Sequence, residues 1–445
     1  MLRKAWTLAI ETLSWIELHH LGERLALTKA AKQLKIQDTK VVGLAHKLVF
    51  ETLRRRNLLD FIINQALAPN MLGDFKLGPQ AFLRLYTYET RFVNSGFSKA
   101  WSIARLGRSI LGWRALKGVE EALGRILGIQ FDGTLKKVSP EERVALLTYN
   151  PLWFVKYCFQ LLGRSDALKF LESATQQSPI YLRINLLKAS EERILKELES
   201  EGIRIEKVPR LKHTYRLLEA KKPLVRTRSF REGLLYIQDM ASCLAAEIAN
   251  PESGMTVLDV CAAPGAKTAY MVQLMQNKGK IFSIDYSRRR MHVWKRQIKR
   301  MDVKIAVPFI ADAGHTLPLR LSADLVILDP PCTSTGTFSK TPSAKWRLTK
   351  RSVLHMAQTQ WRMLQQCAEH VKEEGHLVYS TCSITLEENE MLIEKFLKWY
   401  PEFTLVETQP RIGLPGLRGQ AECQRLYPHL HNCNGFFIAK LLKTG

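Results

Sequence analysis

The chain has 445 residues, of which 46% are hydrophobic and 24% are charged, and this composition excludes an intrinsically disordered protein. Its length indicates two or three folded domains, and no apolar run approaches the roughly 18 residues that a membrane-spanning helix needs. The formal net charge of +24 is spread over the chain, with +10 in residues 1–150, so we expect a nucleic-acid partner in preference to a surface that is basic for solubility alone.

Residues 1–145 are predicted to form a helical domain. Apolar residues recur at helical spacing between Val41 and Leu53, and the pair Gly78-Pro79 marks the start of a new helix. Arginines 54–56 form a basic cluster that is either a solvated helix face or a phosphate contact.

Residues 146–225 are predicted to form a small α/β module. A strand is expected at 179–185 and a second at 203–208, where apolar and polar residues alternate. Between them, Ser190 is placed to cap an amphipathic helix that ends near Gly202.

Residues 226–445 show the rhythm of a parallel α/β sheet. A long helix is expected at 349–371, and strands are predicted at 256–260, 280–285, 304–311, 323–328, 375–380 and 435–440. Strands that alternate with helices place a binding site at the carboxyl ends of the strands.

Small residues and acids follow these strands. The loop after the first strand consists of Cys261, Ala262, Ala263, Pro264, Gly265, Ala266 and Lys267. Small residues let a ligand approach the backbone, although a structural turn is the alternative. Asp285 ends the second strand, where a carboxylate accepts ribose hydroxyls, and Asp312 follows the third, where we expect contact with an adenine amino group. Each acid alone is more commonly a helix cap, but an acid at each of three successive strands favours a nucleoside site.

Two cysteines are expected at the same edge. The fourth strand ends in Asp329-Pro330-Pro331-Cys332, and the next ends in Ser380-Thr381-Cys382-Ser383. Inert packing is the usual role of a buried cysteine. A reactive role is the alternative, and methylation of cytosine at carbon-5 is a reaction that requires a thiol. In that reaction a thiolate adds to carbon-6 of the ring and makes carbon-5 nucleophilic towards a sulfonium methyl group. Asp329 is expected to bind or protonate ring nitrogen 3, and the spacing does not decide which cysteine attacks.

These motifs resemble the RsmB/Sun-type (NSUN-like) family of RNA cytosine-5 methyltransferases. The resemblance extends to Glu387-Glu388-Asn389-Glu390 and to segments 427–429 and 434–437. It implies a Rossmann-like class I S-adenosylmethionine-dependent methyltransferase domain with a seven-stranded mixed sheet at 226–445. An RRM-like module is implied for 146–225 and an all-α NusB-like domain for 1–145. The sequence departs from the family pattern at Thr333-Ser334-Thr335-Gly336 and at Ser343, where many members have Ser-Gly-Ser-Gly and an acid.

The resemblance also implies roles for individual residues. Cys382 becomes the nucleophile, and Cys332 helps to release the product. S-adenosylmethionine is expected to contact the loop 261–267 together with Asp285, Arg290, Asp312 and Asp329. Methylation of RNA is therefore predicted, with ribosomal RNA preferred to transfer RNA.

Two alternatives remain open at this stage. One is an RNA-binding assembly factor without catalysis, and the other is an amino-methyltransferase that acts on adenine or protein and needs no thiol. The eight cysteines form no Cys-x-x-Cys pair, so no metal site is expected. We expect a cytoplasmic protein with no membrane partner, and a monomer is favoured over an oligomer.

Overall fold

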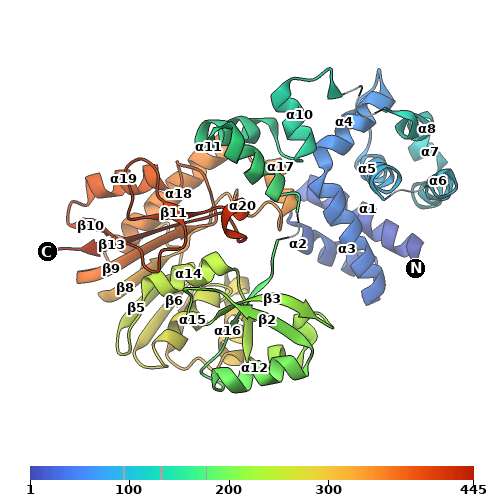
Figure 1. Ribbon diagram of the computed structural model, residues 1–445. Helices are drawn as coiled ribbons and strands as arrows, with labels where there is room; N and C mark the ends of the chain where they lie inside the picture. The colour runs from blue at the N-terminus through green and yellow to red at the C-terminus, as the bar shows by residue number, and fades with distance from the viewer. Residues whose placement is uncertain (94–95, 131–132, 134, 177) are drawn as a thin grey trace. The chain divides into compact units, whose positions relative to one another are not determined.

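The computed structural model describes residues 1–93, 96–130, 133, 135–176 and 178–445. Contacts divide the chain into two compact units (Figure 1). A helical unit comprises Met1–Gln176 with Phe338–Leu348, and a sheet unit comprises Gln177–Thr337 with Thr349–Gly445. The three domains expected at 1–145, 146–225 and 226–445 stay a prediction.

The helical unit confirms the expected helical amino-terminal region. Its core is built from large apolar side chains such as Trp6, Leu59 and Phe82, which lie on the inner faces of amphipathic helices. The Asp38 side chain caps α3 by accepting hydrogen bonds from the backbone N–H groups of Lys40 and Val41. The helices are α1 (Leu2–His19), α2 (Glu23–Gln33), α3 (Thr39–Arg54), α4 (Arg56–Leu67), η1 (Leu72–Asp74), α5 (Leu77–Phe92), α6 (Phe97–Leu111), α7 (Trp113–Leu116), α8 (Glu120–Gly128), α10 (Pro140–Leu147), α11 (Leu152–Ser173) and α17 (Pro342–Arg347).

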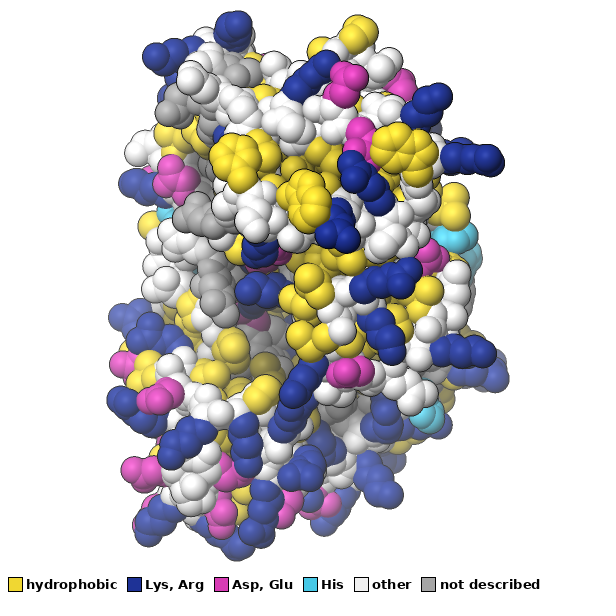
Figure 2. All heavy atoms as spheres, turned by 90° about the vertical axis from the view of Figure 1, so that its right-hand side faces the viewer, with side chains coloured by type: hydrophobic (Ala, Val, Ile, Leu, Met, Phe, Trp, Pro, Cys, Tyr) yellow, Lys and Arg dark blue, Asp and Glu magenta, His cyan; other side chains and the backbone are white. Residues whose placement is uncertain are grey.

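The arginine cluster at 54–56 takes part in ion pairs within this unit. Arg55 pairs with Glu51, and its guanidinium lies over the ring of Tyr88. Arg56 pairs with Glu17 at 2.8 Å. The sequence left two interpretations of this cluster open, a phosphate contact and a solvated helix face. The structure supports neither, because the guanidinium groups of Arg55 and Arg56 already have carboxylate partners. Basic side chains nevertheless outnumber acidic ones on the face that Figure 2 shows.

A segment distant in sequence belongs to the helical unit. We call residues 338–348, which include α17, the anchor segment. Lys345 is 1% exposed, and its Nζ donates to the carbonyl oxygens of Arg54 at 3.0 Å and Tyr149 at 2.5 Å. Two further contacts join the segment to this unit, from Trp346 Nε1 to the Leu53 carbonyl at 2.6 Å and between the rings of Phe338 and Phe154 at 5.0 Å.

The sheet unit contains a small antiparallel sheet in the order β2-β3-β1-β4. Its elements are β1 (Tyr181–Ile184), α12 (Glu191–Ser200), β2 (Ile203–Lys207), β3 (Thr214–Ala220), η2 (Leu224–Arg226), α13 (Arg228–Glu232) and β4 (Leu235–Ile237). The first strand, the helix capped by Ser190 and the second strand confirm the sequence prediction. The strands β3 and β4 were not predicted.

The large sheet confirms the expected mixed α/β fold. Its order is β11-β12-β13-β9-β8-β5-β6-β7, with β10 paired to β13. The five neighbouring strands β9, β8, β5, β6 and β7 are parallel to one another, and β13 is antiparallel to β9. The strands are β5 (Thr256–Val260), β6 (Lys280–Ile284), β7 (Ala306–Phe309), β8 (Ala323–Leu328), β9 (Val371–Thr381), β10 (Phe403–Val406), β11 (Leu414–Pro415), β12 (Gln424–Leu426) and β13 (Phe436–Lys443).

The number of strands differs from the seven expected, because nine are found among the described residues. The difference arises at the outer edge of β13. The short β12 pairs with residues 436–438 of β13, and β10 pairs with residues 440–443. Two short strands therefore share this edge, and β11 extends it by pairing with β12.

Helices cover both faces of the large sheet (Figure 1). Side chains alternate along β8, so that Leu325 and Ile327 pack with α14 and α15, whereas Val326 and Leu328 pack with α18 and α19. The helices are α14 (Met240–Ala249), α15 (Ala266–Leu274), α16 (Arg288–Arg300), α18 (Lys350–Ala368), α19 (Glu390–Trp399) and α20 (Pro428–His431). Among the described residues, no helix combines the length and apolarity that a bilayer crossing requires.

The anchor segment generates a test of stability. Replacing Lys345 with methionine keeps an unbranched apolar stem but removes the donors to two carbonyl oxygens. We expect the local free energy of unfolding in the helical unit to fall by about 1–3 kcal/mol, because buried acceptors lose their partner. Hydrogen exchange of the α3 and α10 amides measures this change. Lys350→Met, at an exposed position of α18, is the control. Equal protection in both variants contradicts the assigned role of Lys345.

Candidate active site

Two cysteine loops lie at one edge of the large sheet. The strands β8 and β9 are parallel neighbours, so the segments that follow them emerge on the same side. The sulfur atoms of Cys332 and Cys382 are 3.1 Å apart. Both side chains are half-buried, and neither cysteine forms a disulfide bond. The expectation that the two cysteines follow neighbouring strands is thereby confirmed.

The surroundings of the two thiols make them unequal. A hydrogen bond from Cys332 lowers the pKa of Cys382, and the Ser334 hydroxyl, 3.4 Å from its sulfur, acts in the same direction against the effect of burial. The pKa of Cys332 is raised by its hydrogen bond to Cys382 and by burial. The hydrogen bond between the two sulfur atoms therefore favours ionisation of Cys382 over ionisation of Cys332.

A buried carboxylate joins the two cysteine loops. Oε1 of Glu388 accepts hydrogen bonds from the Thr333 N–H and from Gln360 Nε2, both at 2.9 Å. Oε2 accepts from the hydroxyls of Ser383 at 2.6 Å and Thr385 at 2.8 Å, and also from the Thr333 hydroxyl. Glu388 is fully buried. It fixes the loop after Cys332 to the loop after Cys382, a role that the sequence did not reveal although its motif was noted.

Asp329 lies between the cysteine loops and the loop after β5. Its Oδ2 atom is 2.5 Å from Nζ of Lys267, which is itself buried and lies 5.6 Å from the Phe436 ring centre. The Ser380 hydroxyl donates to Oδ1 at 3.5 Å. About a third of the Asp329 side chain stays exposed (34%), so the carboxylate is accessible at this edge of the sheet.

The loop 261–267 makes a tight turn between β5 and α15, and access of a ligand to its backbone stays a prediction. Cys261 has a φ of 67° and Gly265 a φ of 105°, so the chain turns sharply before α15 begins at Ala266. Asp285 accepts a hydrogen bond from the Ala263 N–H at 3.3 Å, and Arg290 forms an ion pair with Asp285 at 3.1 Å. Arg290 also donates to the Ala263 carbonyl. These contacts brace the loop against the end of β6.

Cys261 belongs to the core behind this loop. Its side chain packs with the cluster that contains Leu258 and Val260, and burial raises its pKa. A thiol in this setting is an inert packing group, so only the backbone of Cys261 remains a candidate for ligand contact.

Asp312 contacts none of the other predicted site residues in the interactions that the structure shows. Its carboxylate accepts from the Gly314 N–H at 2.9 Å and lies 3.2 Å from Nδ1 of His315, within its own loop. These are loop-stabilising contacts, and the adenine contact expected for Asp312 stays a prediction.

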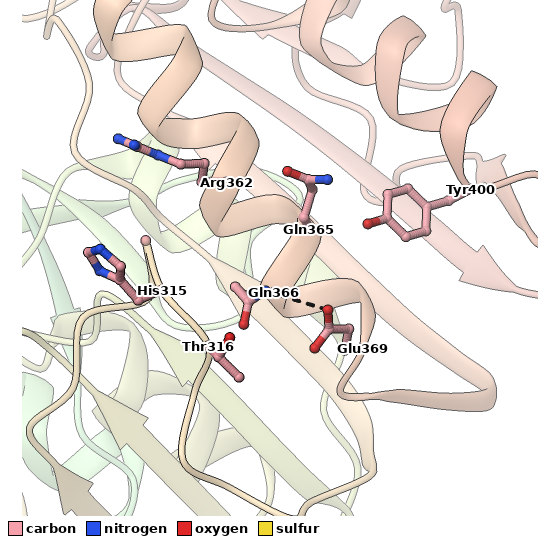
Figure 3. Close-up of a pocket in the computed structure, with 8 residues that line it drawn as sticks. His315, Thr316, Arg362, Gln365, Gln366, Glu369 and Tyr400 are labelled. Carbon is pink, nitrogen blue, oxygen red and sulfur yellow. Dashed lines mark hydrogen bonds between the residues drawn. The ribbon is translucent and has the colours of Figure 1, made fainter.

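A separate depression lies beside this loop. Its volume is about 520 Å³, and Figure 3 shows that its side chains come from the loop 314–316, from α18 and from the end of α19. The lining residues are Gly314, His315, Thr316, Arg362, Gln365, Gln366, Glu369 and Tyr400. None of the predicted catalytic or cofactor residues lines it, so we do not assign the proposed chemistry to this depression.

Comparison with known proteins agrees with this geometry. A family model described as 16S rRNA methyltransferase RsmB/F matches residues 246–442. A second, described as an RsmF/B-like ferredoxin-like domain, matches residues 150–222. The first match includes the strands of the large sheet up to residue 442, and the second includes β1, β2 and β3 of the small sheet, whereas β4 lies between the two matched ranges.

Individual relatives point to the same class. The chain is 29% identical to "Probable ribosomal RNA small subunit methyltransferase B" from Bacillus subtilis, and the match covers 98% of each chain. It is 32% identical to a human protein named 28S rRNA (cytosine(4447)-C(5))-methyltransferase, over 64% of this chain and 36% of the human one. A solved methyltransferase homolog from Pyrococcus horikoshii has a TM-score of 0.63 and 31% identity, covering 69% of this chain and 100% of that one.

The unequal thiols generate a prediction about charge. In a Cys332→Ala variant the thiolate of Cys382 loses a hydrogen-bond donor, so we expect the pKa of Cys382 to rise. The pH at which iodoacetamide alkylates Cys382 at half its maximal rate should then increase, as peptide mass spectrometry can measure. Cys332→Ser keeps a donor and should stay close to the wild type. A midpoint that is unchanged or lower in Cys332→Ala contradicts this assignment of the charge.

Proposed function

The chain belongs to the RsmB/F family of 16S rRNA methyltransferases, and from this membership we propose that it transfers the methyl group of S-adenosylmethionine to carbon-5 of a cytosine in ribosomal RNA. The observation that supports this activity most directly is the 3.1 Å approach of two thiols beside Asp329. The Bacillus subtilis and human relatives carry names that specify ribosomal RNA, which favours that substrate over transfer RNA.

The residues around loop 261–267 fit S-adenosylmethionine chemically. The carboxylate of Asp285 follows β6, where a ribose diol can bind, and the tight turn at Cys261 and Gly265 leads directly into the amino terminus of α15, whose N–H groups favour a polar ligand. Bound there, S-adenosylmethionine supplies an electrophilic sulfonium methyl group. We propose that loop 261–267, Asp285, Arg290, Asp312 and Asp329 hold it, with Asp312 resting on the family resemblance alone.

Cys382 is the proposed nucleophile. Its thiolate forms a bond from Sγ to carbon-6 of the cytosine, and the ring electrons move to carbon-5, which becomes able to attack the methyl group. Asp329 hydrogen-bonds or protonates ring nitrogen 3 during this step. Lys267 holds the Asp329 carboxylate in place, and its positive charge also favours the thiolate of Cys382.

Release of the product reverses the covalent step. Carbon-5 loses its proton to a base, the bond between Sγ and carbon-6 breaks, and the aromatic ring and the Cys382 thiolate are restored. The family resemblance assigns help in this step to Cys332, and its position 3.1 Å from the sulfur of Cys382 supports that assignment. Neither an amino-methyltransferase nor a pure assembly factor requires this pair of thiols, so their close approach favours the cytosine-5 methyltransferase.

The two cysteines should give different phenotypes. We expect Cys382→Ala to abolish transfer of radiolabelled methyl groups to ribosomal RNA, because no adduct can form. Cys332→Ala should instead accumulate an RNA–protein adduct that survives denaturing electrophoresis, and Cys332→Ala/Cys382→Ala should show none. Full turnover by Cys382→Ala would show that the mechanism is wrong. Calorimetric titration of the wild type with S-adenosylmethionine distinguishes an enzyme, which binds this cofactor, from an assembly factor, which should not.

Glu388 should act as a positioning residue. In Glu388→Gln an amide group that donates hydrogen bonds replaces one of two accepting oxygens, so the cysteine loops lose their common anchor. We expect kcat to fall by about 10- to 100-fold while KM for RNA changes little, because displacement of a reacting group by about 1 Å can have that effect. Glu387→Gln, one residue earlier, is the matched control. Equal kcat in both variants contradicts the role of Glu388.

A further inference from the structure

The helical unit presents aromatic side chains to solvent on one side of α6 and α7. Phe97 is 83% exposed, Trp101 61% and Trp113 59%. Together with Arg105 and Arg108 they form what we call the α6 face. Large aromatic side chains are rarely left in water in such a group unless they bind something.

The exposure follows from how α6 packs. Phe97, Trp101, Arg105 and Arg108 recur every three or four residues and so share one side of the helix. The opposite side is buried, and there Gly107 lies so close to the ring of Phe82 that a Cβ atom would be 2.3 Å from it. The helix is therefore fixed in the orientation that turns its aromatic side outward.

The charge of this region has a single sign. Residues 97–117 contain five lysines and arginines and no aspartate or glutamate. Lys99 pairs with Glu89 and Arg108 with Glu120, which lie outside this stretch. Among the described residues, no ion pair is formed by Arg105, Arg114 or Lys117.

The arginines and aromatic rings are arranged together. The guanidinium carbon of Arg105 lies 4.8 Å from the Trp101 ring centre, and that of Arg108 lies 5.7 Å from the Trp113 ring centre. Figure 2, which faces the side where α6 and α7 lie, shows hydrophobic side chains standing among lysines and arginines. Flat rings next to cations offer both a stacking surface for bases and partners for phosphates.

We infer that the α6 face binds an unpaired segment of RNA, distinct from the cytosine that is methylated. Bases would stack on Phe97, Trp101 and Trp113, and Arg105 would meet the phosphates. Arg114 and Lys117, which follow Trp113 in the same basic stretch, would add to the phosphate contact. Unpaired bases are required because those of a duplex are stacked on one another and offer no free ring faces. The absence of acidic side chains from residues 97–117 favours a polyanion over a protein partner. The inference rests on the proposed function only in taking RNA as the ligand.

Equilibrium binding by the full chain tests this inference without methyl transfer. The probes are a fluorescent single-stranded RNA of about 12 nucleotides and the same strand annealed to its complement. Phe97→Ala/Trp101→Ala/Trp113→Ala should weaken binding of the single strand by about tenfold or more, and binding of the duplex by less than about threefold. Trp399→Ala removes an aromatic side chain of the sheet unit that is 67% exposed, and should bind both probes as the wild type does.

Two further variants separate stacking from charge and from misfolding. Trp101→Tyr/Trp113→Tyr keeps flat rings and should retain most of the affinity. Arg105→Ala/Arg114→Ala should reduce the slope of log affinity against log salt by about 1.4 for the single strand, as expected for two phosphate contacts.

The inference is overturned if the triple alanine variant binds the single strand as the wild type does, which would also leave a protein as the occupant of the face. It is equally overturned if single-strand and duplex binding weaken in parallel. The binding experiment contains no S-adenosylmethionine and therefore does not depend on methyl transfer. Loss of single-strand binding would support the inference even if Cys382→Ala retained turnover.

Discussion

The proposed chemistry depends on one buried carboxylate. Glu388 accepts hydrogen bonds from Thr333 on one cysteine loop and from Ser383 and Thr385 on the other. Its negative charge also contributes to raising the pKa of Cys332. The same group therefore holds together the two loops that carry the sulfur atoms, and it helps to make Cys332 the less acidic thiol of the pair. Geometry and protonation are set together, because an acceptor-only group with fixed donors has a single way to be satisfied.

The sheet supplies the frame on which that interaction acts. Successive side chains of the parallel strands are buried on opposite faces of the sheet, and this packing holds the carboxyl ends of the strands in register. Asp329 and Lys267 then connect the loop after β5 with the loop after β8. Each oxygen of the Asp329 carboxylate has a partner, Lys267 for one and the Ser380 hydroxyl for the other, so its position is fixed before any ligand binds.

Much of this arrangement could be predicted from the sequence because the signals are local. Alternating or continuous apolar runs predicted β1, β2 and the parallel strands, and the Cys332 and Cys382 motifs directly follow two of these strands. The strands β3 and β4 were not predicted. In Thr214–Ala220 the alternation of apolar and polar residues is interrupted by the pair Leu217-Leu218, and Leu235–Ile237 is too short to show an alternation. The role of Glu388 depends on donors up to 55 residues away, and no local pattern records such distant partners.

The arginine cluster at 54–56 and the anchor segment show the same limit. Three consecutive arginines attract attention as a binding motif, yet Arg55 and Arg56 have carboxylate partners that only the folded helices bring near. Likewise nothing around Lys345 indicates that its ammonium group meets the carbonyls of Arg54 and Tyr149. A basic side chain in the sequence is evidence about charge, and its partner is decided by tertiary packing.

The path of the chain through the anchor segment makes the helical unit inseparable from the rest. Shortly after Cys332 the backbone leaves the sheet unit, contributes residues 338–348 to the helical one, and returns in time to form α18. Deleting the first 176 residues would thus strip eleven residues in the middle of the remaining protein of their packing partners, exposing Phe338 and Trp346. A truncated protein that begins after residue 176 would therefore need polar substitutions within residues 338–348 to stay as well packed as the full chain.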